Sequence, residues 1–97
     1  MKRDEAIAKL KEHEAELRKA GVRSLFIFGS TARDQARPTS DVDLFFDYDR
    51  GLFDLFDLMK VKRITTEILG QKADIMTRDS LHPMLKSRIE SSSLRVF

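Results

Sequence analysis

Four residues in one short stretch have the types and the spacing of a phosphate-binding and metal-binding site. Gly29 and Ser30 follow an apolar run, and Asp41 and Asp43 lie eleven and thirteen residues after Ser30. Side chains two residues apart on a strand point to the same face, so the two carboxylates would have Cβ atoms about 6.5–7 Å apart. Such a pair can hold one hard cation, or bridge the two ions of a phosphoryl-transfer site.

Asp74 supplies a third carboxylate. It stands in an otherwise apolar run, 73–77, where an unpaired charge would be costly. Pairing of this run with the alternating run 42–48 would bring Asp74 beside Asp41 and Asp43. Three carboxylates suffice to hold two magnesium ions, completed by water and phosphate oxygens.

The Gly29–Ser30 pair is suited to an anion. Glycine permits a close backbone approach, the Ser30 hydroxyl can donate a hydrogen bond, and a helix beginning here would turn its positive end toward a phosphate. Arg33, one turn later, can add a charge-assisted hydrogen bond, or it can be a plain surface side chain. A phosphate held here would lie near cations on Asp41 and Asp43.

Seven elements are expected to position these residues, from the periodicity of the apolar positions and from helix start and stop signals. Helices are expected over 4–20, 30–36 (a turn or two), about 52–69 and 81–91, and strands over 24–28, 42–48 and 73–77. Asp4 and Ser80 are expected as N-caps, and Gly21 and Gly70 as the residues that end helices. The order predicts one small α/β (α+β) domain over residues 1–97, with a short mixed sheet flanked by about four helices.

Side chains away from the carboxylates carry simpler expectations. Apolar residues at helical spacing are expected in the core, with a docking stripe as the alternative for the first three: Phe53, Phe56, Met59, Met84, Leu85 and Ile89. Polar residues without a partner in the sequence pattern are expected to face water: His13, Asp47, Asp49 and His82. The apolar end, 94–97, fits a frayed tail, an extra strand or part of a partner interface.

The composition limits the possible functions. With 41% hydrophobic and 35% charged residues, the chain is typical of a soluble globular domain, and no apolar run approaches the roughly 20 residues that span a bilayer. The charged first residues precede no signal-peptide core, so we expect a cytoplasmic protein. Cysteine is absent and the two histidines are far apart, which disfavours zinc and leaves carboxylates as the expected metal ligands.

Charge is unevenly distributed along the chain. The net charge is only +2, with nine basic and six acidic residues over 1–37, one and six over 38–58, and eight and four over 59–97. Basic segments therefore surround one acidic segment, which fits a bound cation better than a nucleic-acid surface. Direct nucleic-acid binding is not expected, although the basic residues of 59–97 leave RNA contact open.

The sequence resembles the DNA polymerase β-like nucleotidyltransferase superfamily. Gly29-Ser30, then Arg33, then Ser40-Asp41-Val42-Asp43-Leu44 matches its Gly-Ser…Asp-x-Asp signature. The short length, the helix before Gly29 and the single late carboxylate of Asp74 are similar to the minimal nucleotidyltransferases, which are MNT or MntA-like antitoxins.

The resemblance implies a small nucleotidyltransferase domain that uses magnesium to transfer AMP from ATP to a protein hydroxyl. The implied nucleotide-binding residues are Gly29, Ser30, Arg33 and Ser40, and the implied catalytic and metal-binding residues are Asp41, Asp43 and Asp74. Asp74 would also help to activate the acceptor hydroxyl. The implied partner is a HEPN-domain ribonuclease toxin, which receives AMP on a tyrosine, so that the chain would act as a type VII-like antitoxin.

Asp34 departs from the family pattern, in which glycine usually follows the Ala-Arg pair. Aspartate tolerates the left-handed backbone better than most residues, and we expect its side chain to point to solvent and to alter the turn slightly. If it faced the triphosphate instead, its charge would oppose binding.

Other interpretations remain open. Asp41 and Asp43 could form a solvated strand face, and Asp74 could form a salt bridge to Lys72 or Arg78. At the level of function, the chain could be a non-catalytic module that blocks a toxin by contact. It could also be a nucleotidyltransferase that acts on RNA or on a small molecule.

Overall fold

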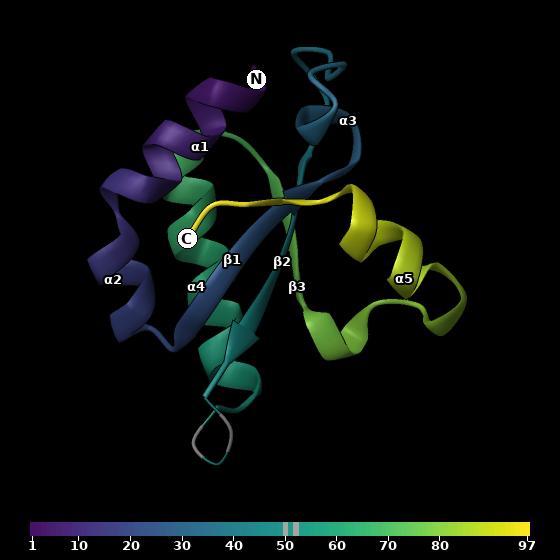
Figure 1. Cartoon of the computed structure of the whole chain (residues 1–97). Helices are drawn as coiled ribbons and strands as arrows, with labels where there is room; N and C mark the ends of the chain where they lie inside the picture. The colour runs from purple at the N-terminus through teal and green to yellow at the C-terminus, as the bar shows by residue number, and fades with distance from the viewer. Residues whose placement is uncertain (50, 52) are drawn as a thin grey trace.

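A four-stranded mixed sheet forms the centre of the fold, in the strand order β3-β2-β1-β4. Figure 1 labels three of these strands, β1, β2 and β3, at the centre of the molecule. The computed structural model describes residues 1–49, 51 and 53–97. The strands are β1 (Val22–Phe28), β2 (Val42–Tyr48), β3 (Ala73–Thr77) and β4 (Leu94–Arg95). The helices are α1 (Arg3–Glu12), α2 (Glu14–Lys19), α3 (Gly29–Ala32), α4 (Leu55–Leu69), the 3-10 helix η1 (Arg78–Ser80) and α5 (Pro83–Ser92).

Two strand pairings bring the ends of three strands together. β1 and β2 are antiparallel, with Phe28 opposite Asp43, and β2 and β3 are parallel, with Asp43 opposite Asp74. The end of β1 therefore lies beside the starts of β2 and β3. The predicted pairing of 42–48 with 73–77 is confirmed, and so are the bounds of both strands.

The core lies between one face of the sheet and helices α1, α2 and α4. Figure 1 shows these three helices on one side of the strands and α5 on the other. Aliphatic and aromatic side chains from both layers are fully buried there, among them Leu10, Leu17, Ile27, Leu44 and Phe46. Each such burial contributes about 1.5–3 kcal/mol to folding. Because side chains alternate along β2, the inward Leu44 and Phe46 turn Asp43 and Phe45 to the opposite face.

That second face is covered by aromatic rings and by one arginine. Phe26 and Phe45 stack with their ring centroids 4.8 Å apart, and the Arg78 guanidinium lies 4.8 and 5.1 Å from the same two centroids. Arg78 also donates two hydrogen bonds to Asp47, at 2.8 and 3.0 Å, and one to Glu90 of α5. Arg78 therefore ties α5 to the sheet, and the expectation that Asp47 simply faces water is wrong.

The N-terminal helical segment is interrupted, whereas the sequence predicts one continuous helix. The single helix expected over 4–20 is two helices, α1 and α2, which meet at His13. The half-buried His13 ring lies with Nδ1 2.9 Å from the Lys9 carbonyl oxygen, so it is not simply solvated. The N-cap of α1 is Lys2, and Asp4 lies in the first turn instead of capping it.

Helix α4 begins later than predicted and turns a different face to the core. Residue 52, where the predicted helix begins, lies outside the described residues; the N-cap is Asp54, which forms a capping box with Asp57. Gly70, in the left-handed conformation at φ 70°, ends the helix as predicted. The predicted burial of Phe56 and Met59 is wrong, because these side chains are 78% and 60% exposed.

The periodicity of α4 explains this outcome. The buried side chains of the helix are Val61, Ile64, Thr65 and Leu69. At 100° per residue, Met59 lies about 200° from Val61 around the helix axis, and it therefore points away from the core. Phe53, which precedes the helix, does pack against the core. For Phe56 and Met59, the docking stripe stays a prediction.

The C-terminal segment differs from the prediction in its cap and in its burial. The N-cap of α5 is His82, whose Nδ1 accepts a hydrogen bond from the Met84 amide at 3.2 Å; Ser80 lies in η1. Met84 is 85% exposed and Leu85 is also exposed, so the expectation that they point inward is wrong. After α5, β4 pairs with β1. Of the three possibilities for the apolar end 94–97, the structure therefore shows the extra strand. Within the described residues, no helix is both long enough and apolar enough to cross a membrane.

Candidate active site

The Gly29–Ser30 turn packs directly against the Asp43 carboxylate. Gly29 has a φ of 72°, which glycine adopts readily, and a Cβ at this position would collide with Asp43 Oδ2. The turn is closed by hydrogen bonds from the Arg33 amide to the Gly29 carbonyl at 3.2 Å and from the Gln35 amide to the Ser30 carbonyl at 2.8 Å. A side chain at position 29 would therefore displace either the turn or the carboxylate.

Asp43 lies between the turn and a second carboxylate. Its register partner is Phe28 on one side and Asp74 on the other. Burial raises the pKa of Asp43 most, the negative charges of Asp74 and Asp41 raise it further, and the positive charge of Arg33 lowers it. Both of the other predicted metal-binding carboxylates, Asp41 and Asp74, therefore lie close enough to Asp43 to disfavour its charged form.

Asp41 is held at the entry to β2 by its neighbours. The Gln71 side-chain amide donates to the Ser40 carbonyl at 2.9 Å, and the Val42 amide donates to the Lys72 carbonyl at 3.2 Å. The Lys72 ammonium lies 3.6 Å from Asp41 Oδ2. The sequence predicts neither the contact of Gln71 with Ser40 nor the pairing of Lys72 with Asp41 instead of Asp74, because both depend on the parallel register of β2 and β3.

Asp74 is exposed, so the prediction of a costly charge at this position is wrong. The sequence suggested a charge that would be costly in an apolar strand, but only alternate residues of β3 are buried and Asp74 is not one of them. Its register position beside Asp43 is nevertheless the predicted one. The alternative salt bridges are also wrong among the described residues, because Lys72 pairs with Asp41 and Arg78 pairs with Asp47 and Glu90.

The carboxylates of Asp41, Asp43 and Asp74 suit a hard divalent cation, although the three side chains do not surround one common metal position. Carboxylate oxygens are the ligands that magnesium prefers, and a cation would relieve the repulsion around Asp43. Within residues 1–49, 51 and 53–97, no three acidic, histidine or cysteine side chains are arranged to hold a metal ion. One of the three carboxylates, that of Asp41, is paired with the Lys72 ammonium at 3.6 Å.

The remaining predicted nucleotide-binding residues lie around the turn. Arg33 is exposed and its Nε donates to Gln35 Oε1 at 3.1 Å, while the Ser40 hydroxyl accepts a hydrogen bond from the Arg37 amide at 3.0 Å. Asp34 has a φ of 57°, and its Oδ1 accepts a hydrogen bond from the Arg3 amide at 3.1 Å. Asp34 is exposed, as predicted, but its carboxylate contacts the start of α1.

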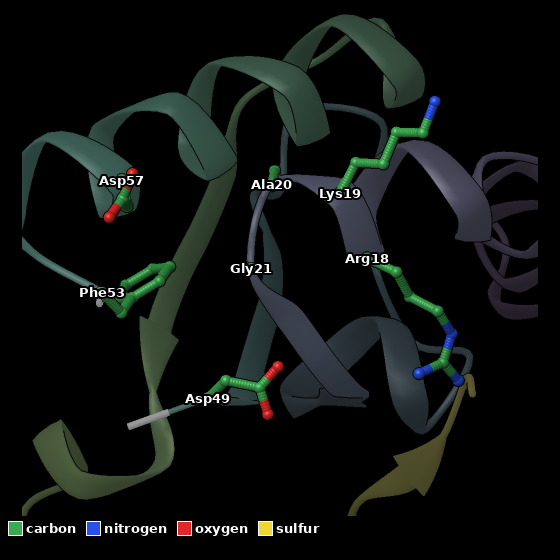
Figure 2. A pocket seen from close by; sticks show the side chains of 7 residues that line it. All are labelled: Arg18, Lys19, Ala20, Gly21, Asp49, Phe53 and Asp57. Atoms are coloured by element: carbon green, nitrogen blue, oxygen red, sulfur yellow. The ribbon is translucent and has the colours of Figure 1, made fainter. Parts of the chain in front are cut away.

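A separate hollow lies at the other end of the sheet, where β1 begins and β2 ends. It has a volume of about 290 Å³ and is lined by Arg18, Lys19, Ala20, Gly21, Asp49, Phe53 and Asp57 (Figure 2). The Arg18 guanidinium donates hydrogen bonds to the Glu14 carboxylate at 2.7 Å and to the Arg23 carbonyl at 2.9 Å. Asp57 serves the capping box of α4, so two of the charged groups in the hollow already have partners.

Comparison with known proteins shows the family of this chain. Residues 7–96 match the sequence profile of the nucleotidyltransferase domain family. This chain belongs to that family. A candidate protein adenylyltransferase of Methanocaldococcus jannaschii is 40% identical over 80 residues, covering 82% of this chain and 85% of the relative. The protein adenylyltransferase MntA of Thermococcus cleftensis is 33% identical over 87 residues, covering 89% of this nucleotidyltransferase and 83% of the relative.

Solved structures confirm the fold. The nucleotidyltransferase superposes on a candidate minimal nucleotidyltransferase with a TM-score of 0.84 and 26% identity, covering 97% of this chain and 95% of the other. It also superposes, with a TM-score of 0.63 and 13% identity, on a structure of a tri-AMPylated Shewanella oneidensis HEPN toxin in complex with an MNT antitoxin. That match covers 90% of this chain and 68% of the other, and it speaks for the fold alone.

Proposed function

We propose that this nucleotidyltransferase transfers AMP from ATP to a hydroxyl of a partner protein. The position of Asp43 carries the proposal, since this carboxylate lies between the Gly29–Ser30 turn and Asp74. A nucleotide held by the turn would therefore place its phosphates beside the carboxylates. The family and the names of the two curated relatives support the same reaction class.

The proposed roles follow the positions of the side chains. Gly29, Ser30, Arg33 and Ser40 would hold the nucleotide, and Asp41, Asp43 and Asp74 would hold two magnesium ions. Bound magnesium would polarise the α-phosphate and stabilise the charge of the leaving pyrophosphate. Asp74 is the exposed carboxylate of the three, and a side chain of another protein can therefore reach it.

The reaction is a single displacement at phosphorus. The acceptor oxygen bonds to the α-phosphorus of ATP, and the bond from that phosphorus to the oxygen of pyrophosphate breaks. The hydroxyl proton passes to the Asp74 carboxylate and from there to water. The Asp43 carboxylate takes part in its ionised form, and in the metal-free protein burial and the charges of Asp74 and Asp41 raise the pKa of this group.

The proposed acceptor is a tyrosine of a HEPN-domain toxin, which makes this chain an antitoxin. The shared fold with the Shewanella oneidensis complex, in which the HEPN toxin is tri-AMPylated, supports this choice. Asp34 is the departure from the family pattern, and a departure of this kind would favour a decayed site that blocks a toxin by contact alone. That argument loses its weight, because the Asp34 carboxylate contacts the Arg3 amide at the start of α1.

The test uses α-labelled ATP, magnesium and lysate of the source cell. The wild type is compared with the Asp41→Asn, Asp43→Asn double variant and with Asp49→Asn as a matched control, since Asp49 is an exposed aspartate at the far end of β2. We expect a labelled protein band with the wild type and with Asp49→Asn, and none with the double variant. Label in RNA or in a small molecule would favour those acceptors instead. A band of equal strength with the double variant would refute the carboxylate assignment.

A further inference from the structure

The turn that carries Gly29 and Ser30 depends on the residues that follow it. Helix α3 is one turn long, and the amides of Arg33, Asp34 and Gln35 bond to the carbonyls of Gly29, Thr31 and Ser30 at 3.2, 3.0 and 2.8 Å. Those three residues are exposed. Any displacement of 33–35 therefore moves the backbone carbonyls of the turn.

Asp34 makes a long-range contact from this segment. Its Oδ1 accepts a hydrogen bond at 3.1 Å from the amide of Arg3, the first residue of α1. Among the hydrogen bonds and ion pairs of the described residues, this is the one that joins residues 33–39 to an element distant in sequence. The N-cap of α1, Lys2, provides no side-chain hydrogen bond. The Asp34 carboxylate instead accepts the hydrogen bond of a free amide at the start of the helix, as an N-cap side chain would.

The backbone of Asp34 shows why aspartate stands here. Its φ of 57° is a conformation that glycine adopts at the least cost, yet glycine has no side-chain acceptor. Aspartate and asparagine both tolerate this conformation and both provide an oxygen at Oδ1. The negative charge also interacts favourably with the amide end of α1.

We propose that Asp34 is a positioning residue, which anchors the nucleotide-binding turn to the first turn of α1. The inference rests on the proposed function in one respect, the role of Gly29 and Ser30 in holding the nucleotide. Without the anchor, the turn would still form, but it would sample positions in which its backbone no longer faces the carboxylates. The consequence is a weaker nucleotide affinity with the fold retained.

The experiment removes the acceptor and the donor separately. Asp34→Gly keeps the backbone conformation and removes the acceptor, whereas Asp34→Asn keeps an acceptor oxygen. Arg3→Pro removes the donor amide together with the side chain; proline is well tolerated at the first position of a helix, and the preceding Lys2 is already extended, at φ −75° and ψ 149°. Arg3→Ala keeps the amide and removes the side chain, as the matched control.

The readout is the dissociation constant of the non-hydrolysable analogue AMP-PNP with magnesium, measured by calorimetry, beside the melting temperature of each variant. We expect Asp34→Gly and Arg3→Pro each to weaken binding about fivefold, equivalent to about 1 kcal/mol. Asp34→Asn and Arg3→Ala should stay within about twofold of the wild type. The variant that combines Asp34→Gly with Arg3→Pro should bind no more weakly than either single variant, because both remove one hydrogen bond.

Three results would overturn the inference. These are wild-type affinity in Asp34→Gly, equal weakening in Asp34→Asn and Asp34→Gly, or losses that multiply in the combined variant. If the wild type itself fails to bind AMP-PNP, the proposed function fails, and the anchor is then judged by hydrogen exchange of the Arg33 and Gln35 amides. Exchange about fivefold faster in Asp34→Gly and Arg3→Pro supports the anchor, and unchanged exchange refutes it.

Discussion

Asp43 and Asp74 are register partners on the parallel strands β2 and β3, and each carries a carboxylate at the same edge of the sheet. Neighbouring carboxylates disfavour the charged form of each other, and the negative charge of Asp74 is one of the causes that raise the pKa of Asp43. This edge of the sheet is therefore built with an electrostatic cost. A bound cation would remove that cost, which links the stability of the protein to its ligand.

Asp43→Asn is expected to stabilise the metal-free protein. Because the pKa of Asp43 is raised in the folded state, the folded protein binds more protons than the unfolded one between the ordinary aspartate pKa and the raised value. Stability is thus lost as the pH rises through that window. Removing the charge should raise the melting temperature at pH 7 by a few degrees, given that 1 kcal/mol corresponds to about 4–8 °C in a domain of this size.

The control for this measurement is Asp49→Asn, which removes an exposed aspartate at the other end of β2. Its melting temperature at pH 7 should equal that of the wild type. Magnesium should raise the melting temperature of the wild type more than that of Asp43→Asn. A lower melting temperature for metal-free Asp43→Asn would contradict the repulsion described here.

Arg33→Gln is expected to shift the acid limb of the transfer activity to higher pH. The positive charge of Arg33 lowers the pKa of Asp43, whereas burial and the other two carboxylates raise it. Without Arg33, the pKa of Asp43 should therefore rise further. Transfer needs the ionised Asp43, and activity falls as the pH drops through the pKa of this group. The shift should be a fraction of a pH unit, because Arg33 is exposed and its field is screened by water.

The measurement is kcat/KM as a function of pH. The readout is the pH at which kcat/KM falls on the acid side, and not the maximum value of kcat/KM. Arg33→Lys keeps the charge and should restore the position. An acid limb at the same pH in Arg33→Gln and in the wild type would show that Arg33 does not act on Asp43.

The strands that carry the site could be predicted from the sequence because their signals are local. The alternation of 42–48 and the apolar run 73–77 gave both bounds correctly, and the carboxylate positions follow from the period of two. The helical face of 52–69 could not be fixed in the same way. Phe56 and Met59 share a spacing with core residues, and only the packing of Val61 and Ile64 decides which face is buried.

The supporting residues of the site could not be predicted, for a different reason. Gln71 and Lys72 lie about thirty residues from Asp41, and their contacts depend on the parallel register of β2 and β3. The same holds for Asp34, whose carboxylate meets an amide thirty-one positions earlier. A charged residue in a loop has many possible partners in the sequence, and only the tertiary arrangement selects one.

Lys72→Gln is expected to tighten the binding of a divalent cation in the absence of nucleotide. The Lys72 ammonium lies 3.6 Å from Asp41 Oδ2, so a cation at this carboxylate must displace it and then remain close to its charge. The pair is largely exposed and worth at most about 1 kcal/mol, which predicts a gain of several-fold in affinity. Electron paramagnetic resonance of free Mn²⁺ measures this directly.

The matched control is Lys60→Gln, which removes an exposed lysine of α4. It should leave the Mn²⁺ affinity within about twofold of the wild type, since distant surface charges are screened. Equal affinities in Lys72→Gln and the wild type would mean that Lys72 does not compete for Asp41.

Arg78→Met is expected to destabilise the fold more than any substitution at the site. The change leaves Asp47 and Glu90 without their shared partner and removes the guanidinium from the rings of Phe26 and Phe45. Breaking such a half-buried, bidentate pair should cost about 2–3 kcal/mol, less than a fully buried pair because water still reaches the carboxylates.

Urea denaturation measures this loss. Arg78→Lys keeps the charge without the fork geometry, and it should recover only part of the stability. Full stability in Arg78→Met would show that α5 is held to the sheet by other contacts.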